Sequence, residues 1–285
     1  MNVCDIHDIK ALLARHGFHF SKSMGQNFLI QDWVPREIAC SSGAGPGTGV
    51  LEIGPGIGPL TLELSRRADK VVSVELDKSL LPLLAETLAG RDNVEIIPGD
   101  ILKTDIPALS ASRFQGLTPI ACANLPYNIT TPVLTALLEA GCFSSITVMI
   151  QREVARRICA GPGTGDYGAF SLYCQYRARC ELLFDVGPEC FLPAPKVTSS
   201  VLRLTPRPAP DEVEDEALFF RAVRASFAMR RKTLLNGLTS AFGGQLTRDQ
   251  LAGAIAACGF PPAVRGETLG IPEFAALARE LGRLL

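Results

Sequence analysis

The four residues Asn124-Leu125-Pro126-Tyr127 are the segment of this sequence best suited to chemistry. The Asn124 side-chain oxygen and the Leu125 carbonyl are two acceptors that can bind the two hydrogens of an exocyclic adenine amine. That amine is a poor nucleophile because its lone pair is delocalised into the ring. Holding both hydrogens favours the pyramidal form, whose lone pair can attack a sulfonium methyl group.

The other two residues of this tetrapeptide suit the same task. Pro126 fixes the backbone direction and has no N–H to compete for the acceptors. Tyr127 can stack on the face of an unpaired base. The tetrapeptide therefore predicts amine methylation through positioning and electrostatics, without a strong general base. The alternative is an ordinary Asn-Pro turn packed by a tyrosine.

A glycine-rich turn precedes this tetrapeptide and indicates a nucleotide-type cofactor. Gly-Pro-Gly occurs three times, but only the copy at 54–58 follows an apolar strand-like segment and opens a helix, with Pro59 at its first position. Glycines there let the backbone approach a ligand closely. Such a turn also occurs in nicotinamide enzymes, so its presence alone does not choose the cofactor.

Three carboxylates make S-adenosylmethionine the better choice. Glu75, 21 residues beyond Gly54, can accept both ribose hydroxyls, as it would in a nicotinamide enzyme. Glu52, just before the turn, suits an amino-acid ammonium better than a pyrophosphate. Asp100 ends the next strand, where it can accept a hydrogen bond from an adenine amine. Each acid has an alternative as a surface or capping carboxylate, but together they favour the sulfonium cofactor.

Alternating strand-like and helical segments place these residues at one edge of a sheet. The order predicts a parallel α/β sheet with helices on both faces, and ligands at the carboxyl ends of the strands. The expected strands are 50–54, 70–75, 94–98, 119–125, 145–151, 181–186 and 197–204, and the expected helices between them include 59–67, 77–90 and 131–141.

A proline-rich acidic stretch at 205–216 reads as a linker to a second domain. Residues 219–238, 246–259 and 271–285 all have helical periodicity, which predicts a small all-α C-terminal domain. The expected domains are 1–206, with an N-terminal helical segment, and 212–285. The densest basic stretch lies in the second, at Arg221, Arg224 and 230–232, and permits a nucleic-acid contact without requiring one.

Composition excludes several classes of protein. The chain has 285 residues, is 47% hydrophobic and 20% charged, and carries a net charge of −1, which describes an ordinary globular protein rather than a disordered or globally basic one. No apolar run is long enough to span a membrane. Nine scattered cysteines without a C-x-x-C pair suit reduced thiols in the cytoplasm. We found no metal-ligand spacing and expect no metal site.

Over nearly its whole length the chain resembles the ribosomal RNA adenine dimethyltransferases, most closely the bacterial type that acts on small-subunit (16S) rRNA. The segments that carry the resemblance are GQNFL (25–29), LEIGPGIGPLT (51–61), NLPYNIT (124–130), QREVARRI (151–158), CFLPAPKVTSSV (190–201), FFRAVRASFAMRRKTLLNGL (219–238) and RGETLGIPEFAAL (265–277).

The resemblance implies a Rossmann-like, seven-stranded class I methyltransferase sheet with a helical C-terminal domain that contributes to rRNA binding. It implies that the cofactor S-adenosylmethionine binds Asn27, Leu29, Gly54, Glu75, Asp100 and Asn124. It also implies that Leu125, Tyr127 and Phe191 hold the target adenine; by itself, Phe191 reads as an apolar loop residue.

The expected activity is two successive methyl transfers to adenine N6 in a small-subunit rRNA hairpin loop, giving dimethyladenosine during ribosome biogenesis. The expected partner is a pre-assembled small ribosomal subunit. The enzyme is expected to be a cytoplasmic monomer with no membrane contact. Alternatives are a large-subunit rRNA methyltransferase of the antibiotic-resistance type, a DNA adenine methyltransferase and a ribosome-assembly factor that chiefly binds. An NAD-dependent oxidoreductase fits the fold but leaves 124–127 unexplained.

Overall fold

The computed structural model describes residues 1–20 and 25–285, and it divides into two compact units. The sheet unit comprises residues 1–155 and 179–206, and the helical unit comprises 156–178 and 207–285. The sequence-based ranges, 1–206 and 212–285, are continuous and differ at 156–178. These residues join the helical unit because Tyr167, Leu172 and Tyr176 belong to its hydrophobic core.

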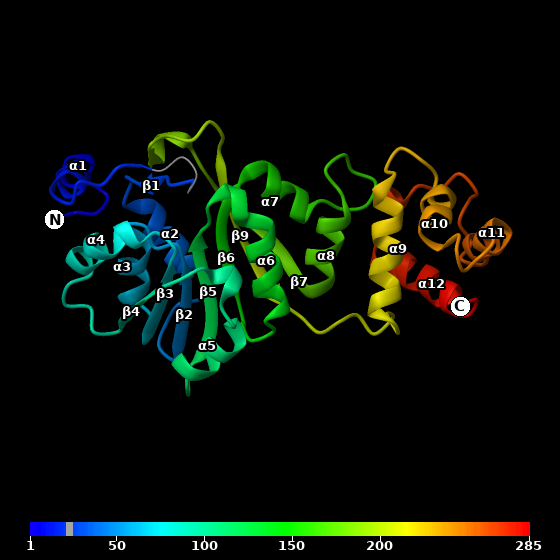
Figure 1. The fold of residues 1–285 in the computed structure, drawn as a ribbon, viewed down its shortest axis with the longest axis horizontal. Helices are drawn as coiled ribbons and strands as arrows, with labels where there is room; N and C mark the ends of the chain where they lie inside the picture. Colours follow the sequence, from blue (N-terminus) through cyan, green and yellow to red (C-terminus); the bar gives the residue numbers. More distant parts are fainter. Residues whose placement is uncertain (21–24) are drawn as a thin grey trace. The chain divides into compact units, whose positions relative to one another are not determined.

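A seven-stranded sheet forms the centre of the sheet unit (Figure 1). Its strand order is β4-β3-β2-β5-β6-β9-β7, and β2 pairs in parallel with both β3 and β5. β3 pairs in parallel with β4 and β5 with β6, whereas β9 is antiparallel to β6. The strands are β2 (Thr48–Ile53), β3 (Lys70–Glu75), β4 (Val94–Pro98), β5 (Thr118–Asn124), β6 (Ile146–Gln151), β7 (Ala178–Val186) and β9 (Ser199–Pro206).

All seven strands occur where the sequence predicts them. The apolar composition of the central strands explains why they lie in the middle of the sheet. Five consecutive residues are buried in each of β2 and β3. Near-continuous apolar runs of this kind suit parallel strands that are covered on both faces. The strand order reverses between β2 and β5, which is where open α/β sheets bind their ligands.

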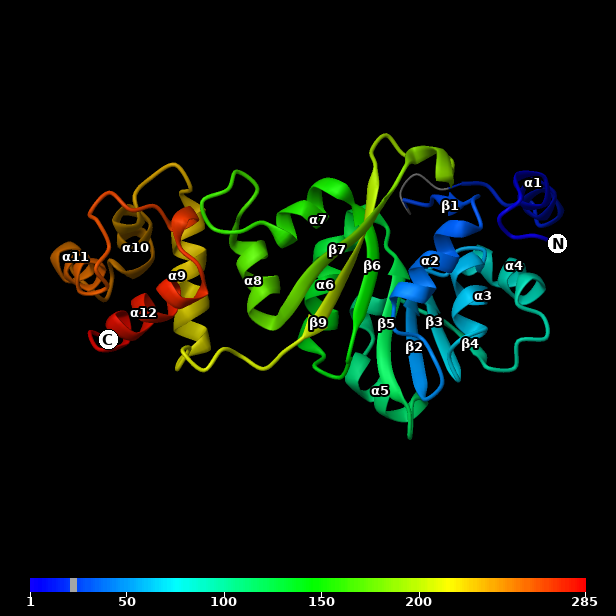
Figure 2. The ribbon, with the colours of Figure 1, turned by 180° about the vertical axis from the view of Figure 1, so that it is seen from behind.

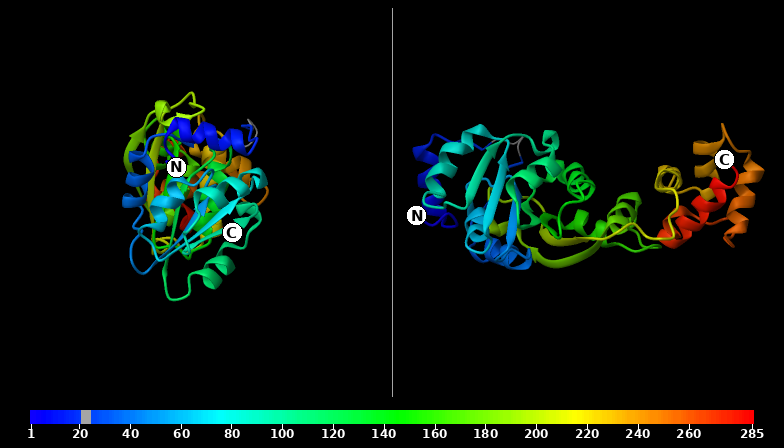
Figure 3. Two further views of the ribbon diagram at one scale, coloured as in Figure 1. Left: turned by 90° about the vertical axis from the view of Figure 1, so that its left-hand side faces the viewer. Right: turned by 90° about the horizontal axis from the view of Figure 1, so that it is seen from below.

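Helices cover both faces of this sheet (Figures 2 and 3). α2 and α3 lie on one face, and α5 and α6 lie on the other (Figures 1 and 2). The helices and 3₁₀ turns of this part of the chain are α2 (Trp33–Ser41), α3 (Pro59–Ser65), η2 (Lys78–Leu80), α4 (Leu81–Thr87), η3 (Ile101–Lys103), α5 (Ile106–Arg113), η4 (Tyr127–Ile129), α6 (Thr130–Glu139), α7 (Arg152–Cys159) and η5 (Pro188–Cys190).

The N-terminal segment adds one helix and a two-residue strand. α1 (Ile6–Arg15) is capped by Asp5, whose carboxylate accepts from the His7 and Asp8 N–H groups. Just after the helix, Gly17 adopts a left-handed conformation with φ +58°. β1 (Phe28–Leu29) then pairs with β8 (Phe191–Leu192) in a separate antiparallel ladder. This ladder brings two segments 162–164 residues apart in sequence to the same place.

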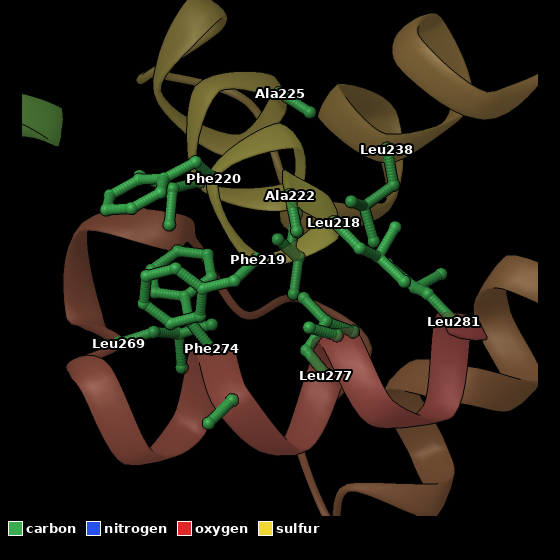
Figure 4. Packing of buried hydrophobic residues seen from close by; sticks show 14 of the residues in the cluster. Leu218, Phe219, Phe220, Ala222, Ala225, Leu238, Leu269, Phe274, Leu277 and Leu281 are labelled. Carbon is green, nitrogen blue, oxygen red and sulfur yellow. The ribbon is translucent and has the colours of Figure 1, made fainter. Parts of the chain in front are cut away.

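The helical unit is built from α8 (Ala169–Arg177), α9 (Glu216–Ala228), α10 (Leu234–Phe242), α11 (Arg248–Ala257), η6 (Gly266–Thr268) and α12 (Ile271–Gly282). Its core packs α9 against α12 through Phe219, Phe274, Leu277 and Leu281 (Figure 4). None of the helices described in 1–20 and 25–285 is long and apolar enough to cross a membrane.

Two features of this unit differ from the prediction. Residues 219–238 have continuous helical periodicity, but α9 ends at Ala228, where Met229 leaves the helical conformation with φ −125° and ψ 59°, and α10 begins at Leu234. Arg230, within the break, binds Glu267 and the Gly165 carbonyl. α8 was not predicted, because AFSLYCQYR alternates apolar and polar residues as a strand does, with Phe170, Leu172 and Cys174 in alternate positions.

Candidate active site

A cleft of about 180 Å³ opens in the sheet unit at the carboxyl ends of β2, β3, β4 and β5. Eight of the nine residues expected at the site line it: Asn27, Leu29, Gly54, Glu75, Asp100, Asn124, Leu125 and Tyr127. Phe191 is not among the lining residues. The parallel strands explain the convergence, because their carboxyl ends meet at one edge of the sheet.

The glycine turn forms the floor between β2 and α3. Gly54 has φ +65° and Gly56 has φ +62°, a left-handed conformation that residues with a Cβ adopt only at a cost. A Cβ at Gly54 would meet no atom within 4 Å, so the turn, rather than crowding, requires the glycine. Pro59 is the first residue of α3, as predicted. Neither of the other Gly-Pro-Gly segments lines the cleft.

Glu75 is buried and holds the glycine turn from the adjacent strand. Its Oε2 accepts from the Gly56 N–H at 3.3 Å, and its Oε1 accepts from the Asp77 N–H at 2.8 Å. Burial raises the pKa of Glu75, and these two backbone N–H groups oppose that rise. The carboxylate thus has a fixed orientation at the end of β3 and keeps further lone pairs for a ligand.

Glu52 lies beneath the glycine turn and is 1% exposed. Its Oε2 accepts from Thr61 Oγ at 2.7 Å and from Ser73 Oγ at 2.6 Å, which ties β2 to α3 and β3. Burial raises the pKa of Glu52 to about 7, with the nearby Glu75 adding to the rise. The carboxylate is therefore a structural link as well as a group that lines the cleft.

Asp100 follows β4, where it caps a 3₁₀ turn and lines the cleft. Its Oδ1 accepts from the Leu102 N–H at 3.0 Å and so caps η3, and its Oδ2 lies 3.8 Å from Lys103 Nζ. The same side chain lines the cleft, as the glycine turn does. Capping fixes the carboxylate at the rim, where it can still accept from a ligand.

The tetrapeptide 124–127 leaves the end of β5 and turns into η4. The Leu125 N–H donates to the Met149 carbonyl at 3.1 Å, which extends the pairing with β6 by one residue. Asn124 Nδ2 makes a long contact of 3.5 Å to the Asn27 carbonyl, and this leaves Oδ1 as the acceptor. Both proposed acceptors therefore sit on an anchored backbone beside the glycine turn.

Residues 25–29 close one side of the cleft. Asn27 Nδ2 donates to the Gly25 carbonyl at 3.1 Å, and Leu29 is held in the β1–β8 ladder. Gln26 Nε2 donates to Asp77 Oδ2 at 2.6 Å, which ties this segment to the loop after β3. The sequence analysis did not single out Gln26 or Asp77, because nothing in the local pattern pairs residues 51 positions apart.

Phe191 is 3% exposed and lies in the hydrophobic core of the sheet unit. It pairs with Leu29 in the β1–β8 ladder, so its backbone supports a residue that does line the cleft. This buried, apolar position agrees with the interpretation of Phe191 from the residue type alone. Its contact with a base stays a prediction.

Comparison with known proteins gives the family to which this architecture belongs. Residues 17–255 match the family described as ribosomal RNA adenine dimethylase. The chain belongs to this family. It is therefore an rRNA adenine dimethyltransferase, and the predicted family and enzyme class are confirmed.

Relatives in this family match the chain from end to end. It is 48% identical over 276 residues to the ribosomal RNA small subunit methyltransferase A of Geobacillus thermodenitrificans, covering 95% of this chain and 94% of the relative. Identity to the protein of the same name from Streptococcus pneumoniae is 45%, over 99% of this chain and 98% of the relative.

Solved structures share the fold. A dimethyladenosine transferase from Plasmodium falciparum aligns with a TM-score of 0.76 at 22% identity, over 90% of this chain and 97% of that one. The 23S rRNA methyltransferase ErmE aligns with a TM-score of 0.68 at 27% identity, over 90% of this chain and 100% of that one. These likenesses confirm the Rossmann-like class I methyltransferase sheet.

Proposed function

We propose that this enzyme transfers methyl groups from S-adenosylmethionine to the N6 amine of adenines in a hairpin loop of small-subunit (16S) rRNA, twice per adenine, during ribosome biogenesis. The observation that carries the proposal is a single cleft in which the glycine turn and the acceptors of 124–125 meet. A cofactor cradle and an amine-binding turn in one cleft are what direct methyl transfer between two bound molecules requires.

The residues of the cleft fit S-adenosylmethionine, which would supply an electrophilic methyl group when bound. Glu75 is fixed by two backbone N–H groups and would accept from the ribose hydroxyls. Asp100 would accept from the adenine amine of the cofactor, and the Gly54 backbone would approach the cofactor without a side chain in the way. Asn27 and Leu29 would border it from the N-terminal segment, with Asn124 at the junction with the target base.

Asn124 and Leu125 would act on the target adenine. The Asn124 Oδ1 and the Leu125 carbonyl would each accept one hydrogen of the amine, which favours a pyramidal nitrogen whose lone pair faces the methyl group. Because both acceptors are anchored before the substrate binds, little reorganisation is needed at the moment of reaction. Tyr127 would stack on the base, and Phe191 is predicted to contact it.

The small-subunit assignment rests on relatives named as small-subunit enzymes, which are 48% and 45% identical to this chain, against 27% for the large-subunit enzyme ErmE. We also propose that the partner is an assembled small subunit. The enzyme itself is proposed to be a monomer in the cytoplasm. A large-subunit specificity or a chiefly binding role in assembly would each show in the test given below.

The helical unit supplies cations suited to rRNA phosphates. Arg221 is engaged with Gln245 and the Phe242 ring, and Arg230 with Glu267. Arg224, Arg231 and Lys232 are also exposed, and in the parts of the chain that the structure describes (1–20 and 25–285) none of the three forms an ion pair. We propose that these three contact phosphate groups, which positions the rRNA without reading its sequence.

The test is methyl transfer from labelled S-adenosylmethionine to unmethylated small ribosomal subunits, with large subunits and duplex DNA in parallel. Products are digested to nucleosides and identified. The proposal predicts labelled dimethyladenosine from small subunits alone. Label in large subunits would move the assignment to the resistance-type activity, and bound cofactor with no label in any sample would favour the assembly role.

A further inference from the structure

The hydroxyl group of Tyr127 is bonded to the protein itself. Tyr127 Oη lies 2.7 Å from Ser199 Oγ, and the two residues are 72 positions apart in sequence. Ser199 is 0% exposed, whereas the Tyr127 side chain is partly exposed and lines the cleft. The phenol therefore reaches inward to a buried partner while the ring borders the site.

The backbone of Tyr127 is held as well. Thr130 Oγ1 lies 3.3 Å from the Tyr127 carbonyl and 3.4 Å from the Pro126 carbonyl. A tyrosine side chain has two rotatable bonds before the ring. Anchoring the backbone at one end and the hydroxyl at the other fixes both of them. Burial raises the pKa of the Tyr127 phenol, so the group is a neutral hydrogen-bonding partner at neutral pH.

Ser199 is a rigid anchor because it begins a paired strand. It lies opposite Gln151 in the β6–β9 ladder, and the preceding carbonyl, of Thr198, accepts from the Arg152 N–H at 3.0 Å. Side chains alternate between the two faces of a strand. Accordingly Ser200, the next residue, is equally buried but donates to Asp185 Oδ1 at 2.5 Å.

We infer that Ser199 is a positioning residue for the methyl transfer, which it serves by holding the Tyr127 ring in the orientation that receives the target base. The inference rests on the proposed function, in which Tyr127 stacks on the adenine. Ser199 touches neither the cofactor nor the base in this account, and it acts only through the Tyr127 hydroxyl.

This role has a distinct kinetic signature. Without the hydrogen bond, the ring must be ordered each time a base binds, and ordering one side chain on binding corresponds to about a three- to tenfold loss of affinity. Stacking holds the base equally before and during methyl transfer, so the KM for the rRNA substrate should rise while kcat changes little. Cofactor affinity should stay at the wild-type value.

The test compares Ser199→Ala, Tyr127→Phe and the double variant, assayed as full-length enzyme on unmethylated small subunits. Each single change removes the same hydrogen bond, so each should raise the KM about three- to tenfold and the double variant no further. Ser200→Ala is the matched control, because it removes a hydrogen bond from an equally buried serine on the same strand, and it should keep the wild-type KM.

A second readout needs no substrate. The chain has four tyrosines, so 3-fluorotyrosine labelling gives few fluorine resonances, and the one absent from Tyr127→Phe belongs to residue 127. Ser199→Ala should shift and narrow that resonance because the ring gains motion, and Ser200→Ala should leave it in place.

Separate outcomes overturn separate claims. If the wild type fails to methylate rRNA, the proposed function falls and this inference with it. If the wild type is active but Ser199→Ala keeps its KM and its fluorine resonance, only the inference is refuted. Additive effects in the double variant would also refute it, as would a loss of cofactor affinity in Ser199→Ala, which would indicate general damage to the cleft.

Discussion

The hydrogen bond between Gln26 and Asp77 should control how tightly the enzyme binds its cofactor. Gln26 Nε2 donates to Asp77 Oδ2 at 2.6 Å, and this contact joins residues 25–29, on one side of the cleft, to the loop after β3. Removing the amide with Gln26→Ala lets the segment leave the cleft more often. Because the cofactor needs the segment in place, the apparent Kd rises as the closed population falls.

The size of the effect follows from the geometry. A hydrogen bond to a charged group contributes about 1.5–3 kcal/mol when well buried, but this one is only part-buried. We therefore expect about 1 kcal/mol, which corresponds to a rise of up to about fivefold in the Kd for S-adenosylmethionine. The Gln26 change is preferable to one at Asp77, whose carboxylate also accepts from the Ser79 N–H and caps η2.

Isothermal titration with S-adenosylmethionine measures this directly. Ser79→Ala is the control: its hydroxyl donates to Asp77 Oδ1 at 2.6 Å, so the change alters the same carboxylate without touching Gln26. Hydrogen exchange at 25–29 should quicken in Gln26→Ala alone. A wild-type Kd in Gln26→Ala, or an equal rise in Ser79→Ala, would refute the reasoning.

Three further predictions concern the turn, the buried acid and the helical unit. Gly54→Ala places a Cβ at φ +65°, so it should lower the free energy of unfolding by about 1–2 kcal/mol, read from urea titration, and weaken cofactor binding. Glu52 has a pKa raised to about 7, so the folded chain holds an extra proton at pH 5–7 and its stability should fall as pH rises through that window. A cationic cofactor favours the ionised form, so the Kd should rise as pH falls below about 7, and Glu52→Gln should flatten both profiles. Replacing Arg231 and Lys232 by Ala should weaken rRNA binding and reduce the salt dependence of log K by about one per lost phosphate contact, without changing cofactor affinity.

Much of the fold could be predicted because its strands, helices and turns leave local patterns in the sequence. Three residues at strand ends, Gly54 after β2, Glu75 in β3 and Asp100 after β4, could be placed at one sheet edge because parallel strands share an end. The tetrapeptide at 124–127 could be interpreted from its own atoms, because both acceptors lie in consecutive residues.

Contacts between distant segments could not be predicted in this way. The Tyr127–Ser199 and Gln26–Asp77 hydrogen bonds join residues 72 and 51 positions apart, and no single-sequence pattern pairs them. The burial of Phe191 also depends on a distant partner, because the β1–β8 ladder that covers it forms only when residues 28–29 reach 191–192. The same limit applies to the Arg230–Glu267 contact in the break after Ala228, which joins residues 37 positions apart.

Asn124→Ala tests the central claim, that the acceptors of 124–125 serve the chemistry in a cleft that other residues hold ready for the cofactor. The measurement is a single-turnover rate of methyl transfer to small subunits at saturating cofactor, together with the Kd for S-adenosylmethionine. The account predicts a rate lowered by about 10²-fold or more, by analogy with the loss of one oriented polar group, and a Kd close to that of the wild type. Equal losses in rate and in cofactor affinity would contradict it.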